Sequence, residues 1–257
     1  MQYLLRAPGK RALQRLVDEP STLYAFDFDG TLARIVQDRD APKLSQPIRS
    51  ALEALSAHAA TAIISGRSLA DLRPRINGAA AHLVGNHGLE GLHTSAQVMQ
   101  QALECCQAWK RTVGKFEETL THSGVVLEDK IYSLTFHYRQ ACSPKVAREA
   151  VFQAIAQLMP PPRLVLGKAV VNVIPSGTPH KGAAMLELMH QLKSSAALYV
   201  GDDDTDEDVF SIPDDRIMTV RIGKKVRSAA RYYLERQAET AALLQYLVEA
   251  HSAGRSR

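Results

Sequence analysis

The sequence contains few cysteines and no long apolar run, and these absences exclude several classes of protein. Of its three cysteines, Cys105 and Cys106 are adjacent and Cys142 stands alone. That spacing matches neither a disulfide framework nor a cysteine metal site, so reduced thiols are expected. No segment approaches the roughly 18 apolar residues of a transmembrane helix. The first residues lack the apolar stretch and cleavage site of a signal peptide, so we expect a cytoplasmic protein.

Aromatic residues are also scarce, at 6%, and the excess of positive charge is small. The net charge is +4, with 46% hydrophobic and 23% charged residues, which is typical of a soluble globular protein. A basic chain suits anionic substrates and also nucleic acid. The basic clusters near the two ends belong to no nucleic-acid-binding motif. We therefore expect a small anionic substrate, no nucleic acid or membrane partner, and a monomer.

Five short apolar runs are typical of buried strands: Leu23–Phe26, Thr61–Ile64, His82–Val84, Leu198–Val200 and Met218–Ile222. Most are continuous rather than alternating, as in parallel strands that are buried on both faces. Helical periodicity lies between them, over Ser45–His58, Lys181–Leu192 and Thr240–His251. Strands that alternate with helices predict an α/β fold with a doubly wound parallel sheet.

The middle of the chain follows another pattern. It reads as one long helix or two short ones, then strand, helix and strand, over Gln97–His122, Gly124–Gln140, Pro144–Leu158 and Leu164–Val173. A β-rich insert between two halves of an α/β domain predicts a second, smaller domain. We place this insert at 96–176, with 1–95 and 177–257 forming the discontinuous main domain.

The strongest chemical signal is the segment Asp27-Phe28-Asp29-Gly30-Thr31, directly after an apolar run. In open parallel sheets, ligands bind beyond the carboxyl ends of the strands. In extended chain Asp27 and Asp29 share one side, because Phe28 separates them. Two close carboxylates repel each other, and a bound cation is the natural remedy. The alternative to a catalytic site is an acidic turn after a strand with no catalytic role.

Three further elements follow at strand or helix ends. Ser65-Gly66-Arg67 comes after the second strand, where a hydroxyl and a guanidinium can hold an anion. Lys181 opens a helix, and an ammonium at a helix N-terminus makes a phosphate site. An acidic stretch at 201–208 follows the strand Leu198–Val200, which is hard to explain by packing.

In this order the four elements resemble the motifs of the haloacid dehalogenase superfamily. The resemblance implies that Asp27 attacks phosphorus and becomes an aspartyl phosphate, and that Asp29 is the general acid and then the base. It implies that Lys181 balances the charge of the nucleophile and the phosphoryl group. It also implies Mg²⁺ on Asp27, Asp202 and the backbone of Asp29, with Asp206 as a further or supporting ligand. The phosphate-binding candidates are Thr31, Ser65, Gly66 and Arg67.

Further segments are similar to the trehalose-6-phosphate phosphatases of this superfamily, namely 85–88, 128–130, 133–134, 137–139, 167–168 and 201–210. The resemblance extends from about Leu23 to Leu247. It implies a Rossmann-like core with an inserted α/β cap domain, and Mg²⁺-dependent hydrolysis of trehalose 6-phosphate to trehalose and phosphate. The additional substrate-binding candidates are Asn86, His87, Glu128, Lys130, Arg139, Lys168 and Asn172.

One position departs from the family pattern. The family usually carries glutamate where this chain has Asn172. A carboxylate accepts hydrogen bonds from two sugar hydroxyls, whereas an amide both accepts and donates. The identity of the sugar therefore stays open. Alternatives are therefore a phosphatase of another phosphosugar, such as sucrose phosphate or mannosyl-phosphoglycerate, a phosphomutase, or a non-catalytic phosphosugar sensor.

Overall fold

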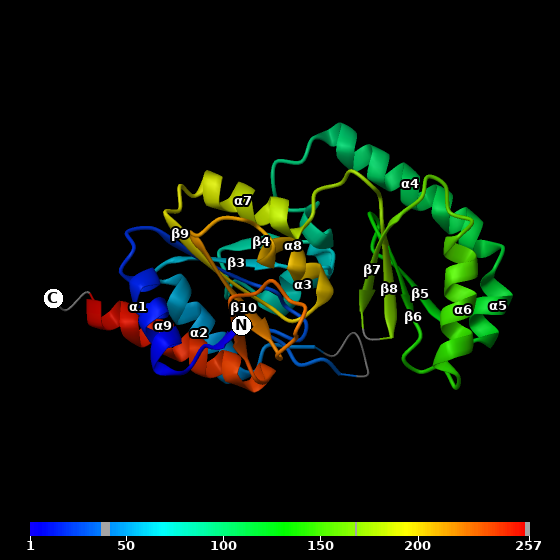
Figure 1. The fold of residues 1–257 in the computed structure, drawn as a ribbon. Coiled ribbons are helices and arrows are strands. Elements are labelled where there is room, and N and C mark those ends of the chain that lie inside the picture. Colours follow the sequence, from blue (N-terminus) through cyan, green and yellow to red (C-terminus); the bar gives the residue numbers. More distant parts are fainter. Residues whose placement is uncertain (37–41, 168, 255–257) are drawn as a thin grey trace. The chain divides into compact units, whose positions relative to one another are not determined.

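The computed structural model describes residues 1–36, 42–167 and 169–254, and it divides into two compact units (Figure 1). The core unit comprises Met1–Leu92 and His180–Arg257, and the inserted unit comprises His93–Pro179. The insert that the sequence predicts over 96–176 falls inside the inserted unit.

The core unit contains a seven-stranded parallel sheet in the order β1-β11-β10-β9-β2-β3-β4. Its strands are β1 (Gln2–Tyr3), β2 (Thr22–Phe26), β3 (Ala60–Ile64), β4 (His82–Val84), β9 (Ala196–Gly201), β10 (Ile217–Ile222) and β11 (Tyr232–Leu234). All five strands expected from apolar runs are present, so the prediction of an α/β fold with a parallel sheet is confirmed. The sequence analysis missed β1, which has only two residues, and β11, whose Tyr232-Tyr233-Leu234 was not recognised as a strand.

Strand β2 shows why the apolar runs are continuous, since all five of its residues are buried. Tyr24 and Phe26 belong to one hydrophobic cluster, together with residues of α1, α2 and α9. Leu23 and Ala25 belong to another, together with residues of α7 and α8. Helices thus cover both faces of the sheet (Figure 1), and neither face of β2 needs polar side chains.

The helices of the core unit are α1 (Ala7–Val17), α2 (Gln46–Ser56), α3 (Leu69–Ile76), α7 (Lys181–Gln191), α8 (Glu207–Phe210) and α9 (Thr240–Gly254), with short 3₁₀ turns at Asn86–Gly88, Asp204–Asp206 and Gln237–Glu239. Helix α3 begins after Ser68, whose hydroxyl accepts a hydrogen bond from the Asp71 amide. This cap satisfies one of the free amides at the start of the helix. Within the described ranges, no helix is both long and apolar enough to cross a membrane.

The inserted unit has a four-stranded antiparallel sheet in the order β5-β6-β8-β7. Its elements are α4 (Ala96–Gly114), α5 (Glu117–His122), β5 (Val126–Asp129), β6 (Leu134–His137), α6 (Pro144–Ile155), β7 (Arg163–Gly167) and β8 (Val170–Ile174). The helices and one face of the sheet share a core that includes Trp109, Phe136 and Val151.

Two expectations for this region can be compared with the structure. Of the alternatives for Gln97–His122, two helices is correct. The prediction of one strand over Leu164–Val173 is wrong, because the segment forms the hairpin of β7 and β8, with Gly167 paired to Val170. Both arms of the hairpin carry similar apolar residues, so the pattern continues through the reversal.

Candidate active site

Three of the predicted site residues, assigned to catalysis, phosphate binding and metal binding, follow three neighbouring strands at their carboxyl ends. Asp27, Ser65 and Asp202 come directly after β2, β3 and β9, which pair side by side. The Asp27 amide donates to the Val200 carbonyl over 2.8 Å, and this bond extends the sheet by one residue. The topology thus brings residues that are distant in sequence to one edge.

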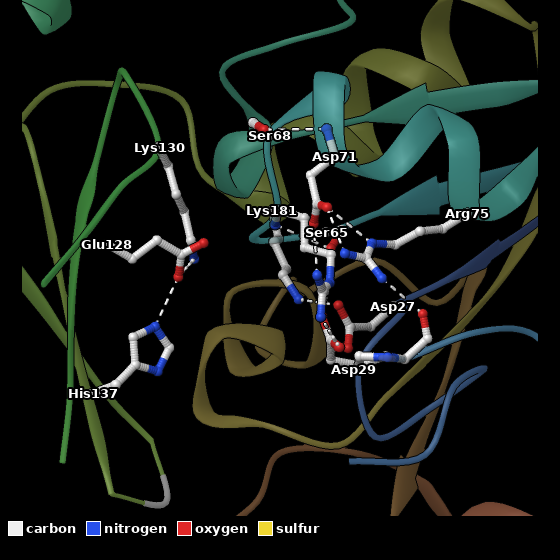
Figure 2. A network of polar contacts seen from close by, with 12 residues as sticks. Asp27, Asp29, Ser65, Ser68, Asp71, Arg75, Glu128, Lys130, His137 and Lys181 are labelled. Carbon is white, nitrogen blue, oxygen red and sulfur yellow. Dashed lines mark hydrogen bonds and ion pairs between the residues drawn. The ribbon is translucent and has the colours of Figure 1, made fainter. Parts of the chain in front are cut away.

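Lys181 is the first residue of α7, and its side chain is buried against two carboxylates (Figure 2). Its Nζ lies 2.8 Å from Oδ1 of Asp27 and 2.8 Å from Oδ1 of Asp206. Burial acts to lower the pKa of Lys181, but the attraction of Asp206 and Asp27 outweighs it and raises this pKa above its ordinary value. The ammonium therefore stays charged and partly neutralises the site.

Asp206 is fully buried, and four donors surround its carboxylate. Besides Lys181, these are the Tyr199 hydroxyl at 2.7 Å and the amides of Asp202 and Asp203 at 2.8 and 2.9 Å. An ionised carboxylate accepts about four hydrogen bonds, so Asp206 is close to saturated. It holds the acidic loop and Lys181 in place. The sequence analysis missed Tyr199, whose only signal is a hydroxyl within an apolar run.

The carboxylates of Asp27, Asp202 and Asp206 form a group that could hold a metal ion, with one oxygen of each within 4.8 Å of the others. Burial, together with repulsion between the carboxylates, raises the pKa of both Asp27 and Asp202. Oδ1 of Asp202 is buried without a hydrogen-bond partner among the described residues. A divalent cation would neutralise this charge and bind that oxygen, so the residues fit such an ion.

Gly30 gives the acidic group room at the end of β2. Its φ is +81°, and a Cβ on it would lie 2.1 Å from Oδ2 of Asp202. Any other side chain would push the Asp202 carboxylate away and strain the backbone as well. The close approach of the first and last motifs therefore requires glycine here.

The Asp29 carboxylate is paired with Arg67, the residue that the sequence analysis assigned to substrate phosphate (Figure 2). Nε of Arg67 lies 2.6 Å from Oδ2 of Asp29, and Nη2 lies 2.8 Å from Oδ1. The third nitrogen, Nη1, donates to Oδ2 of Asp71 at 2.6 Å. The guanidinium also lies over the Phe28 ring, at 5.5 Å from its centroid. Two carboxylates of the protein, those of Asp29 and Asp71, therefore bind the guanidinium that was predicted to bind substrate phosphate.

Further phosphate candidates lie beside these groups. Thr31 is fully buried, and its hydroxyl has no hydrogen-bond partner among the described residues. The Ser65 hydroxyl accepts from the Arg67 amide at 3.2 Å. A Cβ on Gly66 would lie 2.5 Å from the His87 ring, so this ring packs on bare backbone. Hydroxyls and amides at strand ends are suitable donors for phosphate oxygens.

The turn after β4 has an unusual backbone. Asn86 and His87 have φ values of 45° and 59°, and the His87 amide donates to the Ser65 carbonyl at 2.9 Å. The Asn86 side chain donates to Glu90 at 2.7 Å, and the same Glu90 oxygen accepts from the Leu69 amide at 2.9 Å. Glu90 thus ties the turn to α3. The sequence analysis missed it, because a lone glutamate in a loop carries no pattern.

In the inserted unit, the structure groups three of the polar side chains (Figure 2). Oε2 of Glu128 lies 2.7 Å from Nε2 of His137 and 4.0 Å from Nζ of Lys130. Arg139 follows β6 and is exposed, whereas the preceding Tyr138 is buried. Lys168, another candidate for substrate binding, lies outside the described residues.

Asn172 lies in a cross-strand row that contains Glu128, Thr135 and Val165. Partners in such a row point to the same face of the sheet. Oδ1 of Asn172 accepts from the Thr135 hydroxyl at 2.7 Å, and Nδ2 lies 3.4 Å from the Val165 carbonyl. Asn172 is therefore on the face of Glu128, with its oxygen already accepting from Thr135.

Comparison with known proteins agrees with this geometry. A sequence model of a family described as trehalose-phosphatase matches residues 25–238. The chain belongs to the trehalose-phosphatase family. This match extends from β2 to the 3₁₀ turn before α9, and it includes every residue of the candidate site.

Individual relatives support the family assignment. The trehalose-phosphate phosphatase of Mycobacterium tuberculosis is 32% identical over 198 residues, which is 73% of this chain and 50% of that protein. The chain thus spans about half the length of the curated relatives that it matches. A trehalose-6-phosphate phosphatase structure from Aspergillus fumigatus has a TM-score of 0.63 at 25% identity, covering 97% of this chain and all of that one. The C-terminal domain of the C. albicans enzyme has a TM-score of 0.77 at 23% identity, covering 93% and 96%, and shows the shared fold.

Proposed function

We propose that this member of the trehalose-phosphatase family is a Mg²⁺-dependent phosphoric monoester hydrolase. Its substrate is trehalose 6-phosphate, and its products are trehalose and phosphate. We further propose that the protein is a cytoplasmic monomer, acts on a small phosphosugar, and binds neither nucleic acid nor membrane.

The observation that carries the proposal is the setting of Asp27. It is buried at a strand end, 2.8 Å from the Lys181 ammonium, and within 4.8 Å of two further carboxylates. Phosphoryl transfer needs a nucleophile, a proton donor and positive charge on the phosphate oxygens. Asp27, Asp29 and Lys181 supply these at one edge of the sheet.

In the first half of the reaction, a carboxylate oxygen of Asp27 attacks phosphorus, and the bond between phosphorus and the sugar oxygen breaks. Asp29 gives a proton to that oxygen, which leaves as the sugar hydroxyl. Thr31 and Ser65 bind phosphate oxygens in this proposal, and Lys181 offsets the charge that develops near Asp27. The product on the protein is an aspartyl phosphate.

In the second half, the deprotonated Asp29 takes a proton from water while the water oxygen attacks phosphorus. The bond between phosphorus and Asp27 breaks, phosphate leaves, and Asp29 is protonated for the next cycle. Asp27, Asp202 and the backbone of Asp29 would hold Mg²⁺, with Asp206 keeping this set in place. The ion supplies Lewis-acid stabilisation of phosphate charge when bound.

The inserted unit would serve as the cap that recognises the sugar. Glu128 and Lys130 offer both acceptors and donors for sugar hydroxyls, and Asn172 lies on the face of Glu128. Closure of such a cap would exclude bulk water from the aspartyl phosphate.

The test is phosphate release from a panel of phosphosugars, with Mg²⁺ or with EDTA, by wild type and Asp27→Asn. The proposal expects Mg²⁺-dependent release from trehalose 6-phosphate and loss of nearly all turnover in Asp27→Asn. Normal turnover in that variant, with mass spectrometry showing no deamidation back to aspartate, would refute the mechanism.

A second substrate class is favoured by the Thr135–Asn172 hydrogen bond. Asn172 accepts from Thr135 and donates to the Val165 carbonyl, so one lone pair and one amide hydrogen remain, where a carboxylate would offer acceptors alone. A different phosphosugar, such as sucrose phosphate or mannosyl-phosphoglycerate, would suit such a mixed donor and acceptor. Preference for one of these in the panel would keep the chemistry and change the sugar.

A further inference from the structure

A row of charged side chains on helix α3 and just before it ends at Asp29, the proposed general acid and base. Oδ2 of Asp71 accepts from Nη1 of Arg67 at 2.6 Å. Oδ1 of Asp71 accepts from Nε and Nη2 of Arg75 at 2.9 and 2.6 Å. Arg75 in turn donates from Nη1 to the Pro42 carbonyl at 2.9 Å. The contacts run from the Pro42 carbonyl through Arg75, Asp71 and Arg67 to Asp29. Figure 2 labels Arg75, Asp71 and Asp29.

The spacing of these residues follows from the helix. Asp71 and Arg75 are four residues apart and lie along one face of α3, whereas Arg67 stands directly before Ser68, the residue that caps the start of this helix. The two arginine side chains are mostly buried, with 13% and 11% exposed, whereas Asp29 keeps 37%. The arginines are therefore held rigidly, while the carboxylate they hold still faces open space.

The contact with Arg67 constrains the Asp29 carboxylate and leaves some of its lone pairs available. A bidentate guanidinium fixes the plane of a carboxylate and takes one lone pair from each oxygen. About two lone-pair sites remain on Asp29, directed away from Arg67. A proton donor and acceptor needs this combination of fixed direction and open lone pairs.

We propose that Asp71 and Arg75 are positioning residues, which fix the Arg67 guanidinium and through it the orientation of the Asp29 carboxylate. The inference rests on the proposed phosphatase function. In the contacts described above, Asp71 reaches Asp29 through Arg67, and Arg75 reaches it through Asp71 and Arg67. Loss of Asp71 would free Arg67 to turn, and misplacement of a reacting group by about 1 Å costs on the order of 100-fold in rate.

The first test compares Asp71→Asn, Arg75→Gln and their double variant with the control Glu53→Gln. Glu53 forms another i,i+4 ion pair, 3.7 Å from Arg49 and half exposed. Its partner Arg49 contacts the backbone carbonyl of Arg75 and none of the ion pairs between Asp29, Arg67, Asp71 and Arg75. We expect kcat on the sugar phosphate to fall roughly 10- to 100-fold in Asp71→Asn with little change in KM. The double variant should be no worse than Asp71→Asn, because Arg75 acts through Asp71.

The second test uses p-nitrophenyl phosphate, whose leaving group needs no proton. In Asp71→Asn the first step should stay fast while hydrolysis of the aspartyl phosphate slows. A burst of p-nitrophenolate equal to the enzyme concentration should then precede a slow steady state. A purely structural defect would lower the turnover of both substrates equally and give no burst, and this result would overturn the proposal. Variants of Asp71 and Arg75 that behave like Glu53→Gln would overturn it as well.

A crystal structure of Asp71→Asn tests the geometry without reference to activity. The bidentate contact between Arg67 and Asp29 should be broken or rotated, and an unchanged contact would contradict the inference. If wild type releases phosphate from no substrate, the proposed function fails. The crystal structure would still decide whether Asp71 sets the orientation of Asp29.

Discussion

At the scale of single residues, the site depends on one buried ammonium among several carboxylates. Lys181 is the partner of both Asp27 and Asp206, and each contact is 2.8 Å. Removing one member of a buried ion pair leaves an uncompensated charge, which costs more than the pair itself contributes.

Lys181→Met should therefore destabilise the protein as well as abolish turnover. We expect the free energy of unfolding to fall by about 3–5 kcal/mol, because Asp27 and Asp206 lose their buried partner. Urea unfolding followed by circular dichroism measures this. Lys225→Met is the matched control, since Lys225 pairs with Asp204 at the surface, and such pairs contribute roughly 0–1 kcal/mol. Equal losses in the two variants would contradict the expectation.

The raised pKa values of Asp27 and Asp202 predict how stability depends on pH. Burial and the neighbouring carboxylates raise the pKa of Asp27 to about 7 and that of Asp202 to about 9. In the unfolded chain both are about 3.9. The folded state therefore binds more protons, and this contribution to stability, complete below about pH 4, is lost as pH rises through the folded values.

The metal-free protein should thus unfold at lower urea concentration at pH 9 than at pH 6. Mg²⁺ should reduce the difference, because it binds the ionised carboxylates. Urea midpoints with EDTA and with Mg²⁺ at the two pH values measure both effects. Midpoints in EDTA that do not depend on pH would show that these carboxyls are not protonated in the folded state.

Gly30→Ala should weaken metal binding. A Cβ here would collide with the Asp202 carboxylate and would require φ of +81° from alanine. We expect at least about a tenfold weaker apparent Mg²⁺ affinity, measured by calorimetry or by the Mg²⁺ dependence of phosphate release. Gly78→Ala is the control, because it has a similar positive φ and no neighbour within 4 Å of its Cβ. The same loss in both variants would assign the effect to backbone strain.

At the scale of secondary structure, the sequence predicted the elements with a repeated pattern and missed those without one. Strand β4 agrees with the expectation residue for residue, and α7 begins at Lys181 as expected. The edge strand β1 has only two residues and gives no periodic signal. Strands β7 and β8 were not separated, because apolar residues predominate in both arms of the hairpin.

The same limit applies to the candidate site: residues next to elements with a repeated pattern were predicted, and residues without such a pattern were missed. Asp27, Ser65, Lys181 and Asp202 stand at the ends of recognisable elements, so topology alone predicts their proximity. The contacts of Tyr199 and of Glu90 depend on side-chain directions across separate elements. No local sequence pattern encodes these directions.

The N-cap of α3 should contribute measurable stability. Ser68→Ala removes the hydroxyl that accepts from the Asp71 amide, and loss of such a cap costs about 1 kcal/mol. Urea unfolding measures this loss, and Ser95→Ala at the start of α4 is a control with the same type of cap. A difference in kcat between the two variants, with similar stability, would connect α3 specifically to the chemistry.

At the scale of the whole molecule, each unit has its own hydrophobic core. The inserted unit has one cluster, with Trp109 and Phe136 buried at its centre. The core unit has one cluster on each face of its sheet. Compact units with separate cores are capable of folding separately.

The segment His93–Pro179, produced alone, should therefore fold. We expect a circular-dichroism spectrum with helix and strand, and a cooperative urea transition. Trp109 reports on the core directly, since its fluorescence depends on burial, and it is the single tryptophan of the chain. A random-coil spectrum would show that this segment needs the rest of the protein in order to fold.

The position of β9 between β10 and β2 has a consequence for synthesis on the ribosome. Lys181 is translated 154 residues after Asp27. At about 5–20 residues per second, this delay is roughly 10–30 s. During that time β2 lacks its neighbour β9, and Asp27 has no cation. The contiguous segment His93–Pro179 is complete 17 residues before β9 begins at Ala196, so the sheet of the inserted unit can form before β9 joins β2.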